Sequence, residues 1–95
     1  MSGPLRRMVT IVNPQGLHFR PAARFGEAAL RFASRVSVSK DNHTVDGKFW
    51  PDLMLLEAAL GTRLMLEVEG DDAATAIETL AELLESNYEE SEPIA

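Results

Sequence analysis

The chain reads MVTIVNPQGLHFRPAARFGEAALRFA over residues 8–33, and this stretch sets the order of its first elements. Its β-branched beginning, Met8 to Val12, predicts a strand, which Asn13-Pro14-Gln15-Gly16 interrupts with a turn. Residues 20–33 then carry apolar side chains at spacings of three and four, which predicts an amphipathic helix. Pro21 suits the first turn of that helix, because its missing N–H would have no intrahelical acceptor there.

The rest of the chain continues with the same two kinds of pattern. Three more strands are predicted, over residues 35–40, 43–48 and 63–69, and two more helices, over residues 51–60 and 73–84. Asp41-Asn42 suits the hairpin turn, and Gly61 fits the left-handed position that follows a helix. The order β-α-β-β-α-β-α predicts an α+β fold, with a four-stranded, mainly antiparallel sheet covered by three helices on one side.

The helix predicted over residues 51–60 has more apolar residues than one buried face needs. Leu53, Leu56 and Leu60 share a face and are expected in the core. Met54 and Leu55 then point elsewhere, and we expect part of this apolar surplus to face a partner.

The composition is that of one globular domain: 95 residues, of which 45% are apolar and 25% are charged. We expect a single domain over residues 1–95, with a frayed lead at 1–6, an ordered core from about 6 to 88 and a mobile acidic tail at 89–95. The chain has no cysteine, which excludes disulfides, iron–sulfur clusters, thiolate zinc sites and cysteine nucleophiles.

The net charge of −6 has the wrong sign for a protein that binds the phosphate backbone of nucleic acids. No apolar run is long enough to span a bilayer, and residues 1–7 contain no apolar stretch of signal-peptide length. We therefore expect a cytoplasmic monomer with neither a nucleic acid nor a membrane as partner.

His18 lies at or just before the start of the first predicted helix and is the strongest candidate for a reactive group. A helix start leaves several N–H groups without intrahelical acceptors, and its dipole favours negative charge, so it binds phosphate readily. Imidazole is a nucleophile near neutral pH, and Arg20 adds a forked set of donors for phosphate oxygens. The residues alone leave two interpretations open: a phosphoryl acceptor, or an ordinary capping or surface histidine.

The octapeptide Gly16-Leu17-His18-Phe19-Arg20-Pro21-Ala22-Ala23 resembles the active-centre motif of the HPr family, the histidine-containing phosphocarriers of the bacterial phosphoenolpyruvate:sugar phosphotransferase system. Only Phe19 is unusual, because a small residue is more common at this position. The resemblance covers about residues 6–88. It continues, in order and spacing, through Val45, Lys48, Leu53-Met54, Leu56, Gly61-Thr62 and Gly70-Asp71-Asp72-Ala73.

The resemblance implies an open-faced β-sandwich and a phosphorelay. Enzyme I, charged from phosphoenolpyruvate, would phosphorylate His18, and His18 would pass the group to a IIA-type acceptor. Arg20 would assist, and Nδ1 would carry the phosphoryl group, a choice between the ring nitrogens that the residues alone do not make. Such a protein is a phosphoryl carrier without a cofactor, and not a stand-alone enzyme.

Phe49 occupies the position at which many HPr proteins carry a regulatory serine, so control by phosphorylation there is not expected. Around His18 we expect a mostly apolar collar that contacts partners. Arg24 partly replaces the lysines of enteric HPr proteins near the histidine, whereas Glu27 and Asp52 add negative charge. The relay could therefore serve sugar uptake or a regulatory pathway. The collar residues are Phe19, Arg20, Ala23, Trp50, Pro51 and Met54.

Trp50, the only tryptophan, either packs on the core or is an exposed anchor for a partner, since tryptophan is enriched at binding hot spots. The second possibility leads to an alternative function, a non-catalytic interaction module that binds through the Trp50–Met54 face. A metal site at His43 is disfavoured, because two histidines without cysteine and without H-x-x-x-H spacing make a poor ligand set.

Overall fold

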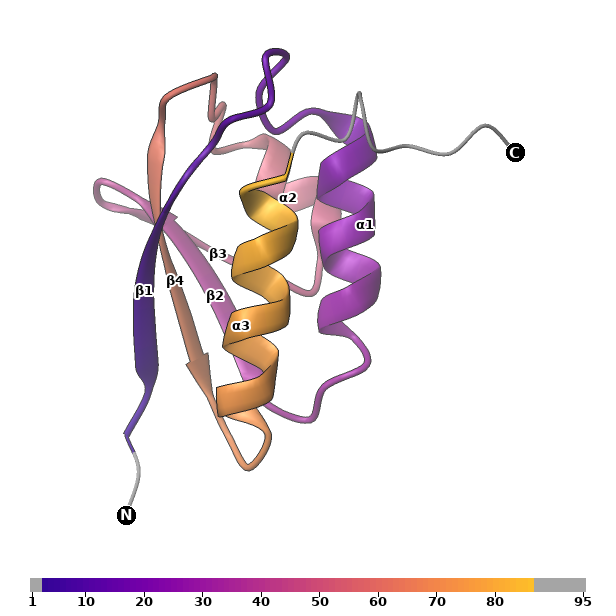
Figure 1. Cartoon of the computed structure of the whole chain (residues 1–95), viewed down its shortest axis with the longest axis vertical. Coiled ribbons are helices and arrows are strands. Elements are labelled where there is room, and N and C mark those ends of the chain that lie inside the picture. The colour runs from indigo at the N-terminus through magenta and orange to yellow at the C-terminus, as the bar shows by residue number, and fades with distance from the viewer. Residues whose placement is uncertain (1–2, 87–95) are drawn as a thin grey trace.

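The computed structural model describes residues 3–86, and its elements follow the predicted order β-α-β-β-α-β-α (Figure 1). The acidic tail expected at 89–95 lies outside the described residues. The strands are β1 (Leu5–Thr10), β2 (Arg35–Lys40), β3 (His43–Asp46) and β4 (Arg63–Glu69). The helices are α1 (Phe19–Ala29), α2 (Trp50–Met54) and α3 (Ala73–Leu84).

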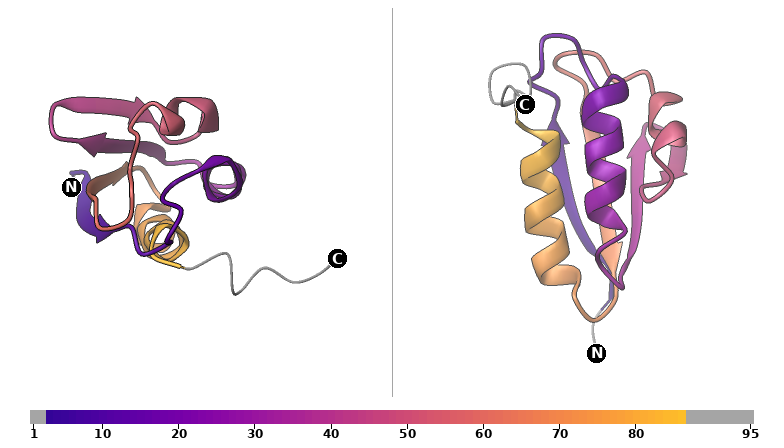
Figure 2. Two further views of the ribbon diagram at one scale, coloured as in Figure 1. Left: turned by 90° about the horizontal axis from the view of Figure 1, so that it is seen from above. Right: turned by 90° about the vertical axis from the view of Figure 1, so that its right-hand side faces the viewer.

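The four strands form one sheet in the order β1-β4-β2-β3, and every neighbouring pair is antiparallel. Val38 of β2 lies opposite Leu66 of β4, and both side chains are buried on the face that the helices cover. Phe25 of α1 is buried in the same core. All three helices lie on one face of the sheet (Figure 2), so the predicted open-faced α+β fold is confirmed.

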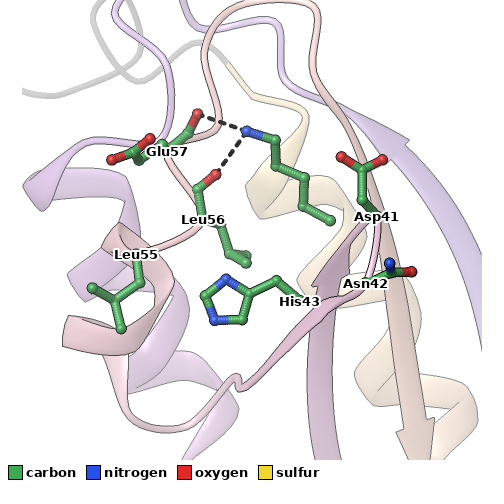
Figure 3. Close-up of a pocket in the computed structure, with 7 residues that line it drawn as sticks. Asp41, Asn42, His43, Leu55, Leu56 and Glu57 are labelled. Atoms are coloured by element: carbon green, nitrogen blue, oxygen red, sulfur yellow. Dashed lines mark hydrogen bonds between the residues drawn. The ribbon is translucent and has the colours of Figure 1, made fainter.

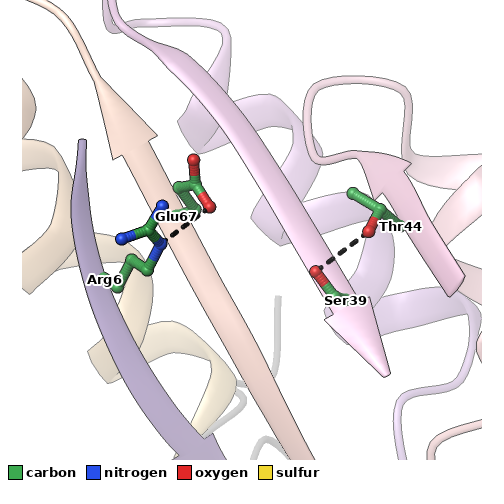
Figure 4. Close-up of polar contacts among 4 residues, drawn as sticks. All are labelled: Arg6, Ser39, Thr44 and Glu67. Atoms are coloured by element: carbon green, nitrogen blue, oxygen red, sulfur yellow. Dashed lines mark hydrogen bonds and ion pairs between the residues drawn. The ribbon is translucent and has the colours of Figure 1, made fainter. Parts of the chain in front are cut away.

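The uncovered face of the sheet carries polar cross-strand contacts (Figure 4). Arg6 Nε lies 3.1 Å from the carboxylate of Glu67 across β1 and β4. Thr44 Oγ1 donates to Ser39 Oγ at 3.2 Å across β3 and β2. Alternation of apolar and polar residues along the strands therefore separates the core from a polar outer face.

The predicted ends of the first two elements were shifted by a few residues. Strand β1 begins at Leu5, within the lead that was expected to fray, because Leu5 pairs with Val68 of β4. Helix α1 ends at Ala29 and not at residue 33. Phe32 N donates to the Ala29 carbonyl at 3.1 Å, a tighter i→i+3 bond that closes the last turn, and Lys48 Nζ donates to the Phe32 carbonyl at 2.8 Å.

The prediction for α2 was wrong in its length, because the helix ends at Met54. Glu57 has φ +51°, a left-handed conformation that stops the helix, and Lys40 Nζ donates to the Leu56 and Glu57 carbonyls at 3.0 and 3.3 Å. Leu56 is buried as predicted, as is Leu53. Leu60 was expected in the core but is 58% exposed. Gly61, with φ +89°, lies in the following loop and does not close the helix.

Candidate functional site

The loop that precedes α1 is held to the loop that precedes β4. Leu17 is buried, and its N–H donates to the Ala58 carbonyl at 2.8 Å. Gly16 has φ +76°, and a Cβ there would lie 2.6 Å from the Ala58 oxygen. Buried Asn13 shapes the turn, because its side-chain oxygen accepts from Gln15 N at 3.1 Å. These contacts fix where α1 begins, and only glycine fits the close approach at position 16.

His18 is the N-cap residue of α1, with an extended backbone at φ −92° and ψ −169°. Its carbonyl accepts the N–H of Ala22 at 3.0 Å, while its imidazole makes no capping hydrogen bond. The ring is half-buried, and its Nε2 is shielded from solvent. The imidazole therefore does not cap the helix. The interpretation of His18 as an ordinary capping histidine is ruled out.

The start of α1 has the electrostatic character of an anion site. The first N–H groups of a helix have no intrahelical acceptor, and the dipole places partial positive charge there. The first turn contains no acidic residue, so no side chain of that turn offsets this charge. Arg20 lies in this turn and is exposed, and Arg24 follows one helical turn later and is also exposed.

Trp50 packs against α1 at the edge of the core. It is half-buried, and its ring meets the ring of Phe19 edge-on, with centroids 5.1 Å apart and planes at 73°. A Cβ added to Gly26 would lie only 2.8 Å from Trp50 Cβ, so α1 and α2 are in close contact. The interpretation of Trp50 as a core-packed residue is the one that the structure bears out. Among residues 3–86, the exposed phenylalanines are Phe19 and Phe49, at 57% and 55%.

The remaining collar residues differ in exposure. Met54 is 36% exposed at the end of α2. Pro51 lies in the first turn of α2 and is half-buried, as is Ala23 on α1. Large apolar side chains that are exposed therefore include those of Phe19 at the N-terminus of α1, Phe49 at the N-cap of α2 and Met54 at the last residue of α2.

His43 lies apart from this site, in a cavity of about 450 Å³ beside the end of α2 (Figure 3). Its imidazole lies near Leu55 and Leu56, and Lys40 approaches the cavity from β2. Among residues 3–86, no group of three histidine, aspartate or glutamate side chains is arranged to hold a metal ion. The metal interpretation of His43 therefore gains no support from its surroundings.

Over residues 5–86 the chain matches the family described as the PTS HPr component phosphorylation site. The chain belongs to the HPr family. HPr proteins are phosphocarriers of the bacterial phosphotransferase system and interact with its enzymes, and the fold described above is theirs. None of the helices within residues 3–86 has both the length and the apolar character needed to cross a membrane.

Curated relatives and solved structures agree with this assignment. The chain is 39% identical over 88 residues to the phosphocarrier protein HPr of Neisseria meningitidis, an alignment that covers 93% of this chain and 99% of the relative. It is 39% identical over 85 residues to HPr of Pseudomonas aeruginosa, covering 88% and 94%. The crystal structure of HPr from Bacillus anthracis superimposes with a TM-score of 0.83 at 32% identity, covering 88% of this chain and all of that one.

Two exposed apolar residues, Phe49 and Leu60, were not predicted as exposed from the sequence. Phe49 was considered only as a replacement for a serine, and Leu60 was assigned to the core. Phe49 precedes the helix predicted over residues 51–60, so the apolar spacing of that helix did not assign it to a buried face. Leu60 gave no signal of exposure, because its spacing from Leu56 matches a continuing helix.

Proposed function

We propose that His18 accepts a phosphoryl group from enzyme I of the phosphotransferase system and passes it to a IIA-type acceptor. The observation that carries this proposal is the position of His18 as N-cap of α1, with an imidazole that does not cap the helix and a first turn without acidic residues. The motif around His18 and the family assignment support the same role.

The transfer needs only a nucleophile and a set of donors for the phosphoryl oxygens. The lone pair of a neutral imidazole nitrogen attacks phosphorus, so that an N–P bond forms as the bond from phosphorus to the donor breaks. The helix-start amides and Arg20 stabilise the charge on the phosphoryl oxygens. The shielding of Nε2 supports Nδ1 as the nitrogen that takes the group.

Several finer features belong to this proposal. The protein acts as a single-domain monomer in the cytoplasm, as a carrier and not as a stand-alone enzyme. Its partners contact the collar around His18, with Arg24 near by. Phe49 has no hydroxyl, so control by a kinase at that position is absent. The output is sugar uptake or a regulatory phosphorelay.

The test is incubation of the purified chain with phosphoenolpyruvate and its cognate enzyme I, followed by intact mass spectrometry. We expect one acid-labile phosphoryl group on the wild-type chain and none on His18→Ala. His43→Ala is the matched control, because it removes the only other histidine and should still be modified. A chain that stays unmodified yet binds a partner through the Trp50–Met54 face would instead support the interaction module.

A further inference from the structure

Lys40 is a lysine on the side of β2 that the helices cover. It is the last residue of β2 and follows Val36 and Val38 at intervals of two, and both valines are buried under the helices. Because side chains alternate between the two faces of a strand, the half-buried Lys40 side chain also points toward the helical layer. Lysine is rarely placed on a covered face unless its ammonium group has a partner there. The partners of that group therefore indicate what Lys40 does.

The ammonium group of Lys40 binds the backbone that follows α2. Its Nζ donates to the Leu56 carbonyl at 3.0 Å and to the Glu57 carbonyl at 3.3 Å (Figure 3). Glu57 has φ +51°, a left-handed conformation that is costly for a residue with a Cβ. A positive charge stabilises carbonyls at the end of a helix. Lys40 therefore favours the backbone conformation in which both carbonyls face it.

The same backbone segment holds the loop that precedes α1. Ala58 is buried, and its carbonyl accepts the Leu17 N–H at 2.8 Å. A Cβ added to Gly16 would lie 2.6 Å from the same oxygen, so the two loops are in close contact. Three consecutive carbonyls, at residues 56–58, are therefore fixed, the first two by Lys40 and the third by the loop before α1.

We propose that Lys40 is a positioning residue for phosphoryl transfer, and that it acts on His18 through the carbonyls of residues 56–58 and the Leu17 N–H. This role rests on the proposed function, since it concerns the geometry of the same histidine. Lys40 keeps the loop before α1 in the arrangement that puts the imidazole at the helix start. A displacement of a reacting group by about 1 Å can slow a reaction strongly. Loss of the lysine should therefore slow the transfer step and leave docking of the donor unchanged.

Lys48 provides a matched control for a lysine with a purely structural part. Its Nζ also donates to a carbonyl just past a helix end, that of Phe32, at 2.8 Å. Phe32 follows the C-terminal end of α1, whereas His18 is the N-cap at the other end. Loss of either ammonium group removes the same kind of bond, but the bond of Lys48 is remote from the loop before α1.

The first measurement follows hydrogen exchange of the Leu17 amide and needs no enzyme. In Lys40→Met and in the milder Lys40→Gln, we expect protection of this amide to fall about tenfold, because the segment that carries its acceptor is no longer held. Lys40→Arg keeps the positive charge and the N–H donors and should retain most of the protection. Lys48→Met should have the wild-type protection at Leu17. Thermal midpoints measured in parallel show which variants are folded.

The second measurement is single-turnover transfer from phosphorylated cognate enzyme I over a range of carrier concentrations. We expect the maximal rate to fall about threefold to tenfold in Lys40→Met and Lys40→Gln, with the half-saturating concentration little changed. Lys40→Arg should retain most of the rate, and Lys48→Met should match wild type.

Three results would overturn the proposed role of Lys40. These are a wild-type maximal rate in a folded Lys40→Met or Lys40→Gln chain, a lower rate without faster exchange at Leu17, and an equal fall in Lys48→Met. A wild-type chain that takes no phosphoryl group at all would instead overturn the proposed function on which this role rests.

Discussion

At the scale of single residues, His18 and Arg20 have separate parts in the proposed transfer. His18 supplies the nucleophile from the N-cap position, and Arg20, two residues later, supplies fixed positive charge. The helix-start amides contribute donors that remain when the Arg20 side chain is removed. A loss of Arg20 should therefore slow the transfer without abolishing it.

Arg20→Ala tests this division directly. We expect the rate of phosphoryl acceptance from enzyme I to fall by about tenfold to a hundredfold, because a charge-assisted contact with the phosphoryl oxygens is lost. Arg20→Lys should recover only part of the rate. Lysine restores the positive charge, but its ammonium group lacks the forked set of donors that arginine has. Quenched-flow kinetics measures both variants. A fall of the same size in Arg24→Ala would show a general charge effect and contradict a particular role for Arg20.

Asp72 predicts a pH dependence of stability at the other end of the molecule. Its carboxylate accepts hydrogen bonds from the buried Ser34 hydroxyl and from Ala33 N at 2.8 Å, and these bonds lower the pKa of Asp72 below its ordinary value of 3.8. A group whose pKa is lower in the folded state stabilises the fold above its unfolded pKa, and this contribution is lost as the pH falls through the folded value.

Urea unfolding of wild type and Asp72→Asn over a range of acidic pH checks this prediction. We expect the wild type to be the more stable at neutral pH, and the difference in unfolding free energy to shrink as the pH falls below 3.8. Asp71→Asn is the neighbouring control and should differ little from wild type at any pH. A difference for Asp72→Asn that stays constant down to strong acid would be evidence against this role.

At the scale of elements, the loop before α1 must be exact in shape for His18 to lie at the helix start. Gly16→Ala forces a left-handed non-glycine residue and a Cβ against the Ala58 oxygen, so we expect a loss of about 1–3 kcal/mol of stability and slower transfer. Gly61→Ala is the matched control, with φ +89° and open space around the new Cβ, and should cost about 1 kcal/mol without slowing transfer. Thermal unfolding and the enzyme I assay measure the two effects.

The pattern along the chain predicted the kind and order of every element, since alternation marks the strands and spacings of three and four mark the helices. It failed at α2, where Leu53, Leu56 and Leu60 keep helical spacing beyond the point at which the helix ends. The helix ends there because Glu57 adopts a left-handed conformation and Lys40 Nζ donates to the Leu56 carbonyl. Neither feature produces a periodic pattern in the sequence. The octapeptide gave His18 and Arg20, but it could not say whether Trp50 or Phe49 would be exposed.

At the scale of the whole molecule, the sheet has one face that the helices cover and one open, polar face. The three helices lie on one side, with His18 at the N-cap of α1, and the polar outer face of the sheet lies on the other. Arg6→Ala removes the ion pair with Glu67 on that outer face. We expect a stability change of at most about 1 kcal/mol, because both partners are solvent-exposed, and no change in transfer rate. Slower transfer in folded Arg6→Ala would mean that partners also use the open face.

The most direct test of the central claim is ¹H–¹⁵N correlation spectroscopy of the histidine rings in the chain phosphorylated by enzyme I. Only two imidazoles are present, so each can be assigned from the single substitutions at His18 and His43. We expect the phosphoryl group on Nδ1 of His18, and we expect the His43 resonances to keep their positions. A phosphoryl group on His43, or on Nε2 of His18, would contradict it.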